Sequence, residues 1–217
     1  GGKDAACPPR RDNIYMKPKI KILPPNQGYD LAASNYDKKE KYLNSFEQNQ
    51  VLPLLDNLTG KKVLDAGAGT GRLAVELARR GAFVTALDIS GEMLKVLARK
   101  NKYMELSVGD VEMMPFEKNT FDWVVSAFVI VHLKDLTRFF DEVYRVLKDG
   151  GKFLVTNINQ KEPPEVETSV GPIKIESYYH RPEKIKEILE SLAFRIEKEI
   201  ITKEGENWID QILVAVK

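Results

Sequence analysis

Three glycines at alternate positions, Gly67, Gly69 and Gly71, lie between a predicted buried strand at residues 62–66 and a predicted helix at residues 72–80. Glycine allows a turn to take positive φ and allows a ligand to approach the main chain without meeting a Cβ atom. The free N–H groups that open the helix favour a carboxylate or a phosphate. We do not expect packing alone to require three glycines in five residues, so the stretch predicts a cradle for a nucleotide-type cofactor.

An acidic residue ends the second predicted strand, because the apolar run at residues 82–87 is followed by Asp88. Ligands of open α/β sheets bind outside the carboxyl ends of the strands, where a carboxylate can accept hydrogen bonds from both hydroxyls of a ribose. The alternative is that Asp88 only caps the next predicted helix, residues 91–102, a role that Ser90 can fill unaided.

The two histidines are the candidates for proton transfer. His132 follows the strand predicted at residues 121–126, where an imidazole can take a proton from a hydroxyl or an amine. The alternative is that His132 fixes the segment 128–133 by hydrogen bonding. His180 has the same two interpretations, a substrate contact or a contact at the start of the next helix. The histidines lie far apart in the sequence, and we predict no metal site.

The elements that must position these residues follow an α/β pattern. Amphipathic helices alternate with five predicted strands, at residues 62–66, 82–87, 104–108, 121–126 and 152–156. Asp135 is expected to N-cap the last of these helices and Gly150 to stop it. This order predicts parallel strands with helices on both faces of the sheet.

The rest of the chain departs from this alternation. Residues 157–172 contain two adjacent prolines and several glutamates, and they predict a loop at the carboxyl edge of the sheet. Residues 173–179 fit either a short strand or an extended lead-in. Pro182 is expected to open a helix, and two β-type runs at residues 194–202 and 208–216 predict an antiparallel hairpin.

The segment ahead of the first strand has two parts. Residues 1–28 are rich in proline and glycine and predict an extended arm. Residues 29–58 predict two helices, and Tyr29, Ala33 and Tyr36 share one face of the first. That face fits either the core or a lid over the site. We expect a single domain at residues 29–217, with residues 29–58 as its lid.

Composition limits the class of protein. Of the 217 residues, 43% are hydrophobic and 30% are charged, which is typical of soluble globular proteins, and no apolar run approaches the ~18 residues of a membrane span. We expect a cytoplasmic protein, because Cys7 is the one cysteine and no secretory signal pattern is present. A net charge of +1 argues against a broad nucleic-acid interface, although the arm is locally basic.

The glycine spacing separates two families of cofactor-binding domain. A dinucleotide-binding turn is G-x-G-x-x-G, and Arg72 occupies the position of its third glycine. The run Asp65 to Gly71 resembles instead the first motif of the class I S-adenosylmethionine (SAM) dependent methyltransferases, an acidic strand end followed by G-x-G-x-G. The run Y-D-x-x-A-x-x-Y-D at residues 29–37 is similar to the opening of many small-molecule methyltransferases.

The resemblance implies a Rossmann-like methyltransferase fold: a doubly wound, seven-stranded, mostly parallel sheet with helices on both faces and its last strand antiparallel. It implies that Asp88 binds the ribose, that Ile89 packs on the adenine, and that Asp110 and the backbone N–H of Val111 bind the adenine edge. The full set of implied cofactor contacts is Tyr29, Tyr36, Asp65, Ala66, Gly67, Gly69, Gly71, Asp88, Ile89, Met93, Asp110, Val111, Ser126 and Ala127.

The implied activity is transfer of the SAM methyl group by in-line displacement to an oxygen, nitrogen or carbon nucleophile of a small-molecule acceptor, with S-adenosylhomocysteine (SAH) as the product. Such a reaction needs neither a metal nor a covalent enzyme intermediate. Two alternatives remain, a non-catalytic SAM-binding scaffold and an NAD-dependent oxidoreductase. The protein is expected to be a monomer or a homodimer, and the acceptor is not predicted.

Overall fold

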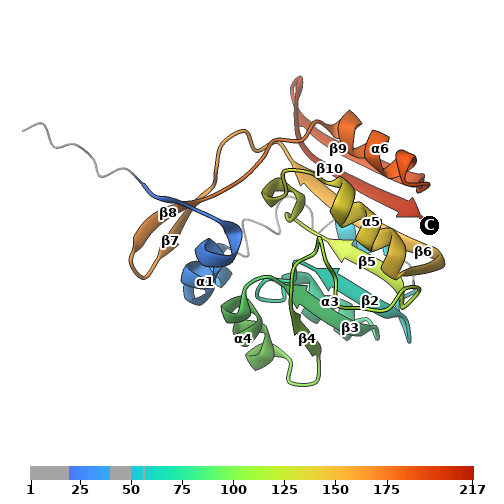
Figure 1. Ribbon diagram of the computed structural model, residues 1–217, viewed down its shortest axis with the longest axis horizontal. Helices are drawn as coiled ribbons and strands as arrows, with labels where there is room; N and C mark the ends of the chain where they lie inside the picture. The colour runs from blue at the N-terminus through green and yellow to red at the C-terminus, as the bar shows by residue number, and fades with distance from the viewer. Residues whose placement is uncertain (1–19, 40–49, 56) are drawn as a thin grey trace, which may run out of the picture.

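The computed structural model describes residues 20–39, 50–55 and 57–217 of the chain (Figure 1). Seven strands form the main sheet, in the spatial order β4 (Glu105–Val108), β3 (Phe83–Asp88), β2 (Lys62–Ala66), β5 (Phe121–Ser126), β6 (Leu147–Ile158), β10 (Asn207–Val216) and β9 (Arg195–Glu204). The α-helices are α1 (Pro25–Tyr36), α3 (Arg72–Arg79), α4 (Gly91–Lys100), α5 (Thr137–Val146) and α6 (Pro182–Ser191). The described residues also form two 3-10 helices, η1 (Asp37–Lys39) and η2 (Ile130–His132), and residues 50–54 are helical.

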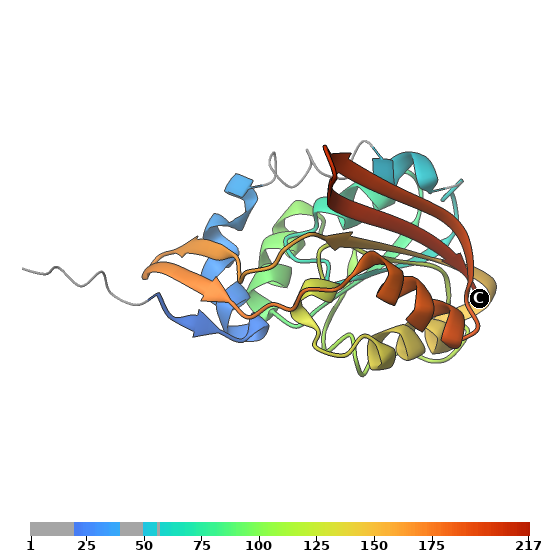
Figure 2. The same ribbon diagram turned by 90° about the horizontal axis from the view of Figure 1, so that it is seen from above.

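The sheet separates two apolar cores because successive strand residues point to opposite faces. On β2, Leu64 packs with α5 and α6, whereas Val63 packs with α3, α4 and residues 51–55. Figure 2 shows these two helical layers on opposite sides of the strands. Both β2 residues are fully buried, as expected for a central strand covered on both faces.

The chain order places the carboxyl ends of β2, β3 and β5 together. From the central β2, the chain builds outward through β3 to β4 and then crosses to β5 and β6, so the order reverses between β2 and β5. Asp65 pairs in register with Ala86 on one side and with Val125 on the other. This switch point is where an open α/β sheet forms its ligand crevice.

The predicted fold class is confirmed. The strands from β4 to β6 are parallel, β10 is antiparallel to both β6 and β9, and helices cover both faces. The predicted hairpin is β9–β10, and Pro182 opens α6 as expected. In the described ranges, no helix is long and apolar enough to cross a membrane.

Two predicted boundaries around α5 were wrong. Gly150 does not stop this helix, which ends at Val146, because Leu147 already takes an extended conformation and pairs with Phe121 of β5. Gly150, at φ +73°, instead lies within β6, where the register with β5 shifts. Asp135 is one residue too early to be the N-cap, but its carboxylate accepts the Thr137 N–H at 2.9 Å.

The larger correction concerns the segments predicted as a loop and as an arm. Residues 157–172 are not a continuous loop, because β7 (Glu165–Thr168) pairs antiparallel with β8 (Gly171–Ile175). The predicted arm is also too long, because β1 (Ile22–Leu23) pairs parallel with β8 and α1 begins at Pro25. Residues 1–19 of that arm, and residues 40–49 of the second predicted helix, lie outside the described residues.

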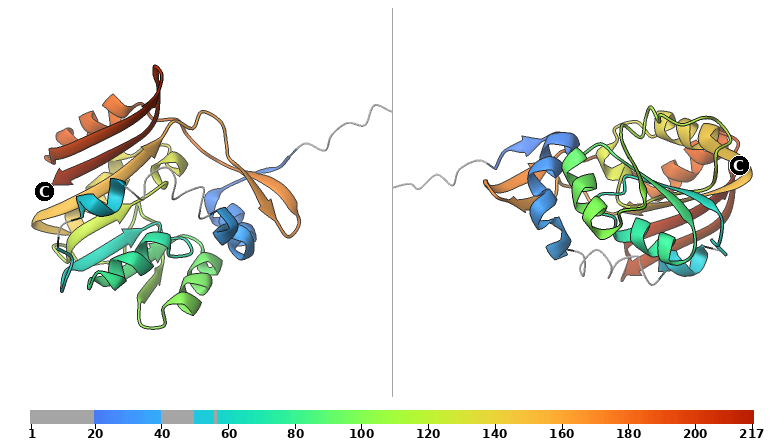
Figure 3. Two further views of the ribbon diagram at one scale, coloured as in Figure 1. Left: turned by 180° about the vertical axis from the view of Figure 1, so that it is seen from behind. Right: turned by 90° about the horizontal axis from the view of Figure 1, so that it is seen from below.

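We call the assembly of β1, α1, β7 and β8 the cap. Its apolar residues form a third core, separate from the two cores of the main sheet, made of Leu23, Ala32, Ala33, Val166, Ile173 and Ile175 together with Met93 of α4. Figure 3 shows α1 between the β7–β8 hairpin and α4. The hairpin depends on α1 for its buried face, because an isolated two-stranded ribbon is not stable in water.

Deleting residues 1–37 is therefore expected to have a local effect. The main sheet and its two cores remain, so far-ultraviolet circular dichroism should still report a folded domain. The β7–β8 hairpin loses β1 and α1, and limited proteolysis should cleave it much faster than in the full chain. Deleting residues 1–19 is the control and should leave the hairpin protected. Equal resistance of the hairpin in both deletions would contradict the cap as one packed unit.

Candidate active site

Two of the three motif glycines are packed closely against neighbouring side chains, so packing accounts for part of the motif. A Cβ atom on Gly67 would lie 2.1 Å from Cγ2 of Val129, and one on Gly71 would lie 2.1 Å from Cδ1 of Leu97. Both glycines also have positive φ, +83° and +88°. They allow the turn to pass tightly between the end of β5 and α4, whether or not a ligand is bound.

Gly69 is different. Its φ is +54°, and a Cβ atom built on it would have no protein atom within 4 Å. Gly69 lines a cavity of about 340 Å³ at the carboxyl edge of the sheet. The open space above this residue is therefore the part of the motif that packing does not explain.

Asp88 organises the turn beside this cavity. Its Oδ2 accepts the Gly69 N–H at 2.7 Å, and its Oδ1 accepts the Ser90 N–H at 2.8 Å. Burial raises the pKa of the Asp88 carboxyl to about 6, against the opposing effect of these two N–H donors. Ser90 is the N-cap of α4 and accepts the Met93 N–H, so Asp88 is not needed as the cap.

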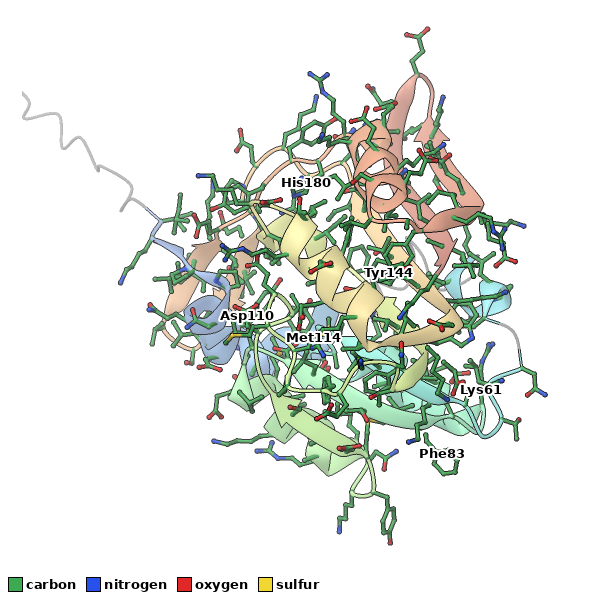
Figure 4. All side chains as sticks on the ribbon, turned by 45° about the vertical axis from the view of Figure 1, so that its right-hand side comes forward. Lys61, Phe83, Asp110, Met114, Tyr144 and His180 are labelled. Atoms are coloured by element: carbon green, nitrogen blue, oxygen red, sulfur yellow. The ribbon has the colours of Figure 1, made fainter. Side chains whose placement is uncertain are left out.

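The other predicted adenine and ribose contacts lie around the same cavity. Ile89 is 42% exposed, although it is a large apolar residue, and it lines the cavity together with Met93, Asp110 and Val111. Asp110 accepts the Glu112 N–H at 2.9 Å. Figure 4 shows Asp110 beside α1, and Phe83 and Lys61 at the opposite edge of the sheet.

The loop that carries Asp110 is held from α5. The N–H of Met114 donates to Glu142 at 2.6 Å, and Arg145 donates to the carbonyls of Met114 and Phe116. Glu142 and Arg145 are also paired with each other. This network fixes the cavity wall without contributing a side chain to it.

A small extension of about 50 Å³ reaches from the glycine turn toward β2. It is lined by Asp65, at the end of β2, and by Arg72, the first residue of α3, together with Gly67, Gly69, Thr70, Tyr36, Leu73, Ala68, Ala127 and Phe128. Asp65 is only 2% exposed. A carboxylate and a guanidinium therefore line the same narrow space.

Helix α1 forms the roof, and two aspartates anchor it. Asp30 accepts the Ser90 hydroxyl at 2.6 Å, which ties α1 to the turn after β3. Asp37 accepts the Thr70 hydroxyl at 2.6 Å and pairs with Lys100 of α4 at 2.8 Å, which ties the end of α1 to the glycine turn. The segment with the Y-D-x-x-A-x-x-Y-D motif thus lies against the cavity and packs in the cap, apart from the two cores of the main sheet.

The tyrosines of the same motif line the cavity from above. The rings of Tyr29 and Tyr36 meet edge to face at 5.7 Å, and Ala33 between them is buried in the cap. Burial is the main cause that raises the pKa of Tyr29 well above 10, with Tyr36 contributing. Tyr29 is therefore a neutral phenol at physiological pH.

His132 connects the roof to the sheet. Its Nδ1 lies 2.7 Å from the Glu176 carbonyl, which can only accept, so Nδ1 carries the proton. Its Nε2, 2.7 Å from the Tyr29 hydroxyl, is then the acceptor of the Tyr29 O–H. Burial lowers the pKa of His132, so the imidazole is neutral and Nε2 holds a lone pair in the cavity wall.

A second cavity, of about 600 Å³, adjoins the first. Four residues line both cavities and so form the boundary between them: Tyr29, Tyr36, Phe128 and His132. The rest of the second cavity is lined by Val131, Ile158, Asn159, Gln160, Pro164, Glu165, Val166, Trp208 and Ile209. Asn159 donates to the Trp208 carbonyl at 2.7 Å and so holds this wall in place.

Some predicted site residues support the cradle and do not line these cavities; they are His180, Ser126, Ala66 and Gly71. The Nε2–H of His180 donates to the carbonyls of Ile130 and Leu133, so His180 holds η2. Ser126 is fully buried, and its hydroxyl donates to the carbonyl of Ala66, a bond that joins β5 to β2. These side chains fix the strands and turns from which the lining residues project.

Sequence reasoning missed Arg72, Phe128 and Trp208 as site residues. Arg72 was noted only as a departure from the dinucleotide motif, and Phe128 only as part of the segment before His132. Nothing in the sequence indicates that β10 brings Trp208 to the second cavity. Within the described ranges, no group of three or more His, Cys, Asp or Glu side chains is arranged to hold a metal ion.

The chain is similar in sequence to known methyltransferases. A family model described as "Methyltransferase domain" matches residues 64–155. The chain is 31% identical over 131 residues to a demethylmenaquinone methyltransferase of Streptomyces avermitilis, covering 58% of this chain and 57% of that protein. It is 34% identical over 141 residues to a malonyl-[acyl-carrier protein] O-methyltransferase of Salmonella typhimurium, covering 64% and 55%. The chain thus spans just over half the length of these relatives.

The fold itself recurs in solved structures. Magnesium protoporphyrin IX methyltransferase from Synechocystis PCC 6803, with SAM bound, superposes with a TM-score of 0.60 at 23% identity, covering 82% of this chain and 79% of that one. The sheet order and the glycine cradle define a nucleotide-cofactor-binding α/β domain. Residues 64–155 thus match a methyltransferase domain, and the chain is similar to the class I, Rossmann-like SAM-dependent methyltransferases, the family that the glycine motif resembles.

We expect Gly69→Val to abolish SAM binding and Gly205→Val to leave it intact. Both positions have positive φ, and a Cβ atom at either would meet no protein atom, so both variants should lose a similar ~1–3 kcal/mol of stability. Only the valine side chain at position 69 would enter the cavity. Thermal unfolding and calorimetric titration with SAM measure the two effects. Equal SAM affinity in the two variants would show that the cofactor does not lie over Gly69.

Proposed function

We propose that this chain is a SAM-dependent methyltransferase that binds SAM in the 340 Å³ cavity and a small, apolar, ring-bearing acceptor in the adjoining 600 Å³ cavity. The observation that carries the proposal is the shared boundary of the two cavities. A methyl group must pass directly from donor to acceptor, so the two binding sites must lie next to each other. Tyr29, Tyr36, Phe128 and His132 form that boundary.

The chemistry of SAM fits the first cavity at both ends. The ribose hydroxyls are donors, and the Asp88 carboxylate is the buried acceptor beside Gly69. Ile89, Met93 and Val111 supply apolar contacts for the adenine, and Asp110 supplies an acceptor for its amine. Each of these assignments follows the position of the residue in the family motif and its place in the cavity lining.

The amino-acid end of SAM is a zwitterion, which distinguishes it from a dinucleotide. The 50 Å³ extension offers a carboxylate, Asp65, and a guanidinium, Arg72. We assign Asp65 to the ammonium group and Arg72 to the carboxylate of the methionine moiety, because Arg matches a carboxylate with two donors in one plane. A pyrophosphate would meet Asp65 as a like charge, which disfavours the NAD-dependent alternative.

Methyl transfer is a displacement in which the acceptor lone pair bonds to the methyl carbon while the C–S electron pair returns to sulfur. The protein has to align the two molecules and exclude water. The anchored α1 lies over the donor site, and Pro164 and Val166, on the β7–β8 side of the cap, line one wall of the acceptor cavity.

His132 and Tyr29 can remove a proton from the acceptor. The neutral Nε2 of His132 already accepts the Tyr29 hydroxyl proton. If the acceptor hydroxyl or amine donates to the Tyr29 oxygen, Tyr29 passes its own proton to Nε2, and no buried phenolate accumulates. The Glu176 carbonyl then faces the Nδ1–H of an imidazolium, which it stabilises.

The acceptor class follows from the cavity walls. Trp208, Phe128, Ile158, Ile209 and Val166 provide aromatic and aliphatic surface, and this surface favours a ring-bearing acceptor. The names of the two relatives give demethylmenaquinone and a malonyl-[acyl-carrier protein] as their substrates. Sequence similarity therefore does not identify the acceptor of this chain. The walls favour an acceptor of the first kind.

The test is SAH release from SAM with a panel of acceptors. The panel contains a reduced, unmethylated naphthoquinone, a simple phenol, an aryl amine and a malonyl thioester. We expect the naphthoquinol to be methylated fastest, and His132→Gln to slow SAH release on the order of 10²-fold, with a much smaller change in SAM affinity. If the protein binds SAM but forms no SAH with any acceptor of the panel, the result would favour the non-catalytic alternative.

SAM affinity should depend on pH through Asp88. The carboxylate accepts the ribose hydroxyls only when it is ionised, and its pKa is raised to about 6. Calorimetric affinity should therefore be constant above neutral pH and weaken by up to about tenfold per unit as the pH falls below 6. Asp88→Asn should bind weakly at every pH, and His132→Gln should keep the wild-type pH profile. Equal wild-type affinity at about one pH unit below this pKa and two units above it would contradict the ribose role.

A further inference from the structure

Phe128 has a backbone conformation that bulky residues avoid. Its φ is +61°, in the left-handed region, whereas the other two described non-glycine residues with positive φ are Asn119 and Ala193. An L-residue with a large side chain is strained there, at a cost on the order of 1–3 kcal/mol. Such strain persists only where the surrounding structure holds it.

Two contacts, together with the burial of residues that follow it, hold Phe128 in place. Its N–H donates to the Thr156 hydroxyl on β6 at 3.1 Å, and the next residues lead into η2, where Ile130 and Val131 are buried. The guanidinium carbon of Arg72 lies 5.3 Å from the centroid of the Phe128 ring. The strained conformation thus places the ring beside Arg72 and into the boundary between the two cavities.

Phe128 and Tyr36 line all three spaces: the cofactor cavity, its amino-acid extension and the acceptor cavity. Of these two aromatic residues, only Phe128 has a strained backbone, and its ring lies beside Arg72. In SAM the sulfonium lies between the amino-acid chain and the ribose and carries the methyl group toward the acceptor. The position where these three spaces meet is therefore the position that suits the sulfonium. An aromatic face attracts a cation there.

We propose that Phe128 is held in its strained conformation so that its ring contacts the sulfonium and distinguishes SAM from SAH, an inference that rests on the proposed function. The acceptor electron pair forms the new bond to the methyl carbon, and the C–S bond breaks with its electrons returning to sulfur. The sulfur becomes a neutral thioether. Its attraction to the ring is lost at that moment, so the same residue holds the substrate cofactor and promotes release of the product.

The decisive measurement is the ratio of the SAH and SAM dissociation constants, which needs no acceptor. Phe128→Leu keeps a large apolar side chain but removes the aromatic face. We expect this ratio to fall roughly two- to thirtyfold, through weaker SAM binding, while SAH binding changes little. Phe128→Tyr retains an aromatic face and should restore most of the ratio. If Phe128 only supports the structure, Phe128→Leu should change the affinities for SAM and SAH alike. The same holds if the variant only alters Arg72, because Arg72 is assigned to the amino-acid moiety that SAM and SAH share.

The strain is tested by a second pair of variants. Phe128→Ala and Phe128→Gly both remove the ring, but only glycine relieves the positive φ. We expect Phe128→Gly to unfold at a higher temperature than Phe128→Ala, the reverse of the usual order of these residues. Ala193→Gly, at φ +66° and outside the lining of the cavities, is the control: it should likewise raise the unfolding temperature and leave the SAH/SAM ratio unchanged.

The outcomes separate the role of the ring from the proposed function. A wild-type chain that binds neither SAM nor SAH contradicts the proposed function itself. A wild-type chain that binds both, with the same SAH/SAM ratio in Phe128→Leu, overturns only the role of the ring. An unfolding temperature of Phe128→Gly below that of Phe128→Ala overturns the strain.

Discussion

The attachment of α1 to two turns of the main sheet is the interaction on which the site depends. Asp30 accepts the Ser90 hydroxyl and Asp37 accepts the Thr70 hydroxyl, so one helix is fixed to both the turn after β3 and the glycine turn. Without it the carboxyl edge of the sheet is open to water. With it, Tyr29 meets His132 and the hairpin gains an apolar partner, so the proposed lid, base and acceptor site all depend on the placement of α1.

Several features at this edge cost folding free energy, and they coincide with the proposed site. Burial raises the pKa of Asp88 from its ordinary value of 3.8 to about 6. The folded state therefore becomes less stable as the pH rises from 3.8 to about 6 and the buried carboxyl ionises. Phe128 has positive φ, and Gly69 lacks a side chain where space is open. The main-sheet cores, by contrast, contain many fully buried apolar residues. Stability supplied by the cores offsets the cost of the site.

Local patterns predicted most of the fold and part of the site. The glycine motif, Asp88 and the central strands are specified by adjacent residues, so periodicity and turn chemistry located them within one or two positions. The strands of the cap were missed because they bury only a few residues each, such as Val166 and Ile175, and do so against α1, which is distant in sequence. Phe128 and Trp208 were missed for the same reason: backbone strain and tertiary position leave no periodic signal. Two of the motif glycines, Gly67 and Gly71, are also packed closely against Val129 and Leu97, which the sequence did not indicate.

SAM bound between the glycine turn and α1 would cover both segments at once. Hydrogen exchange of backbone amides, with and without saturating SAM, tests this placement most directly. We predict slower exchange in residues 25–37 and 67–71 and at the turn after β3, with no change at the opposite edge of the sheet around Phe83. Protection confined to the glycine turn, with α1 exchanging as fast as in the free protein, would contradict the placement.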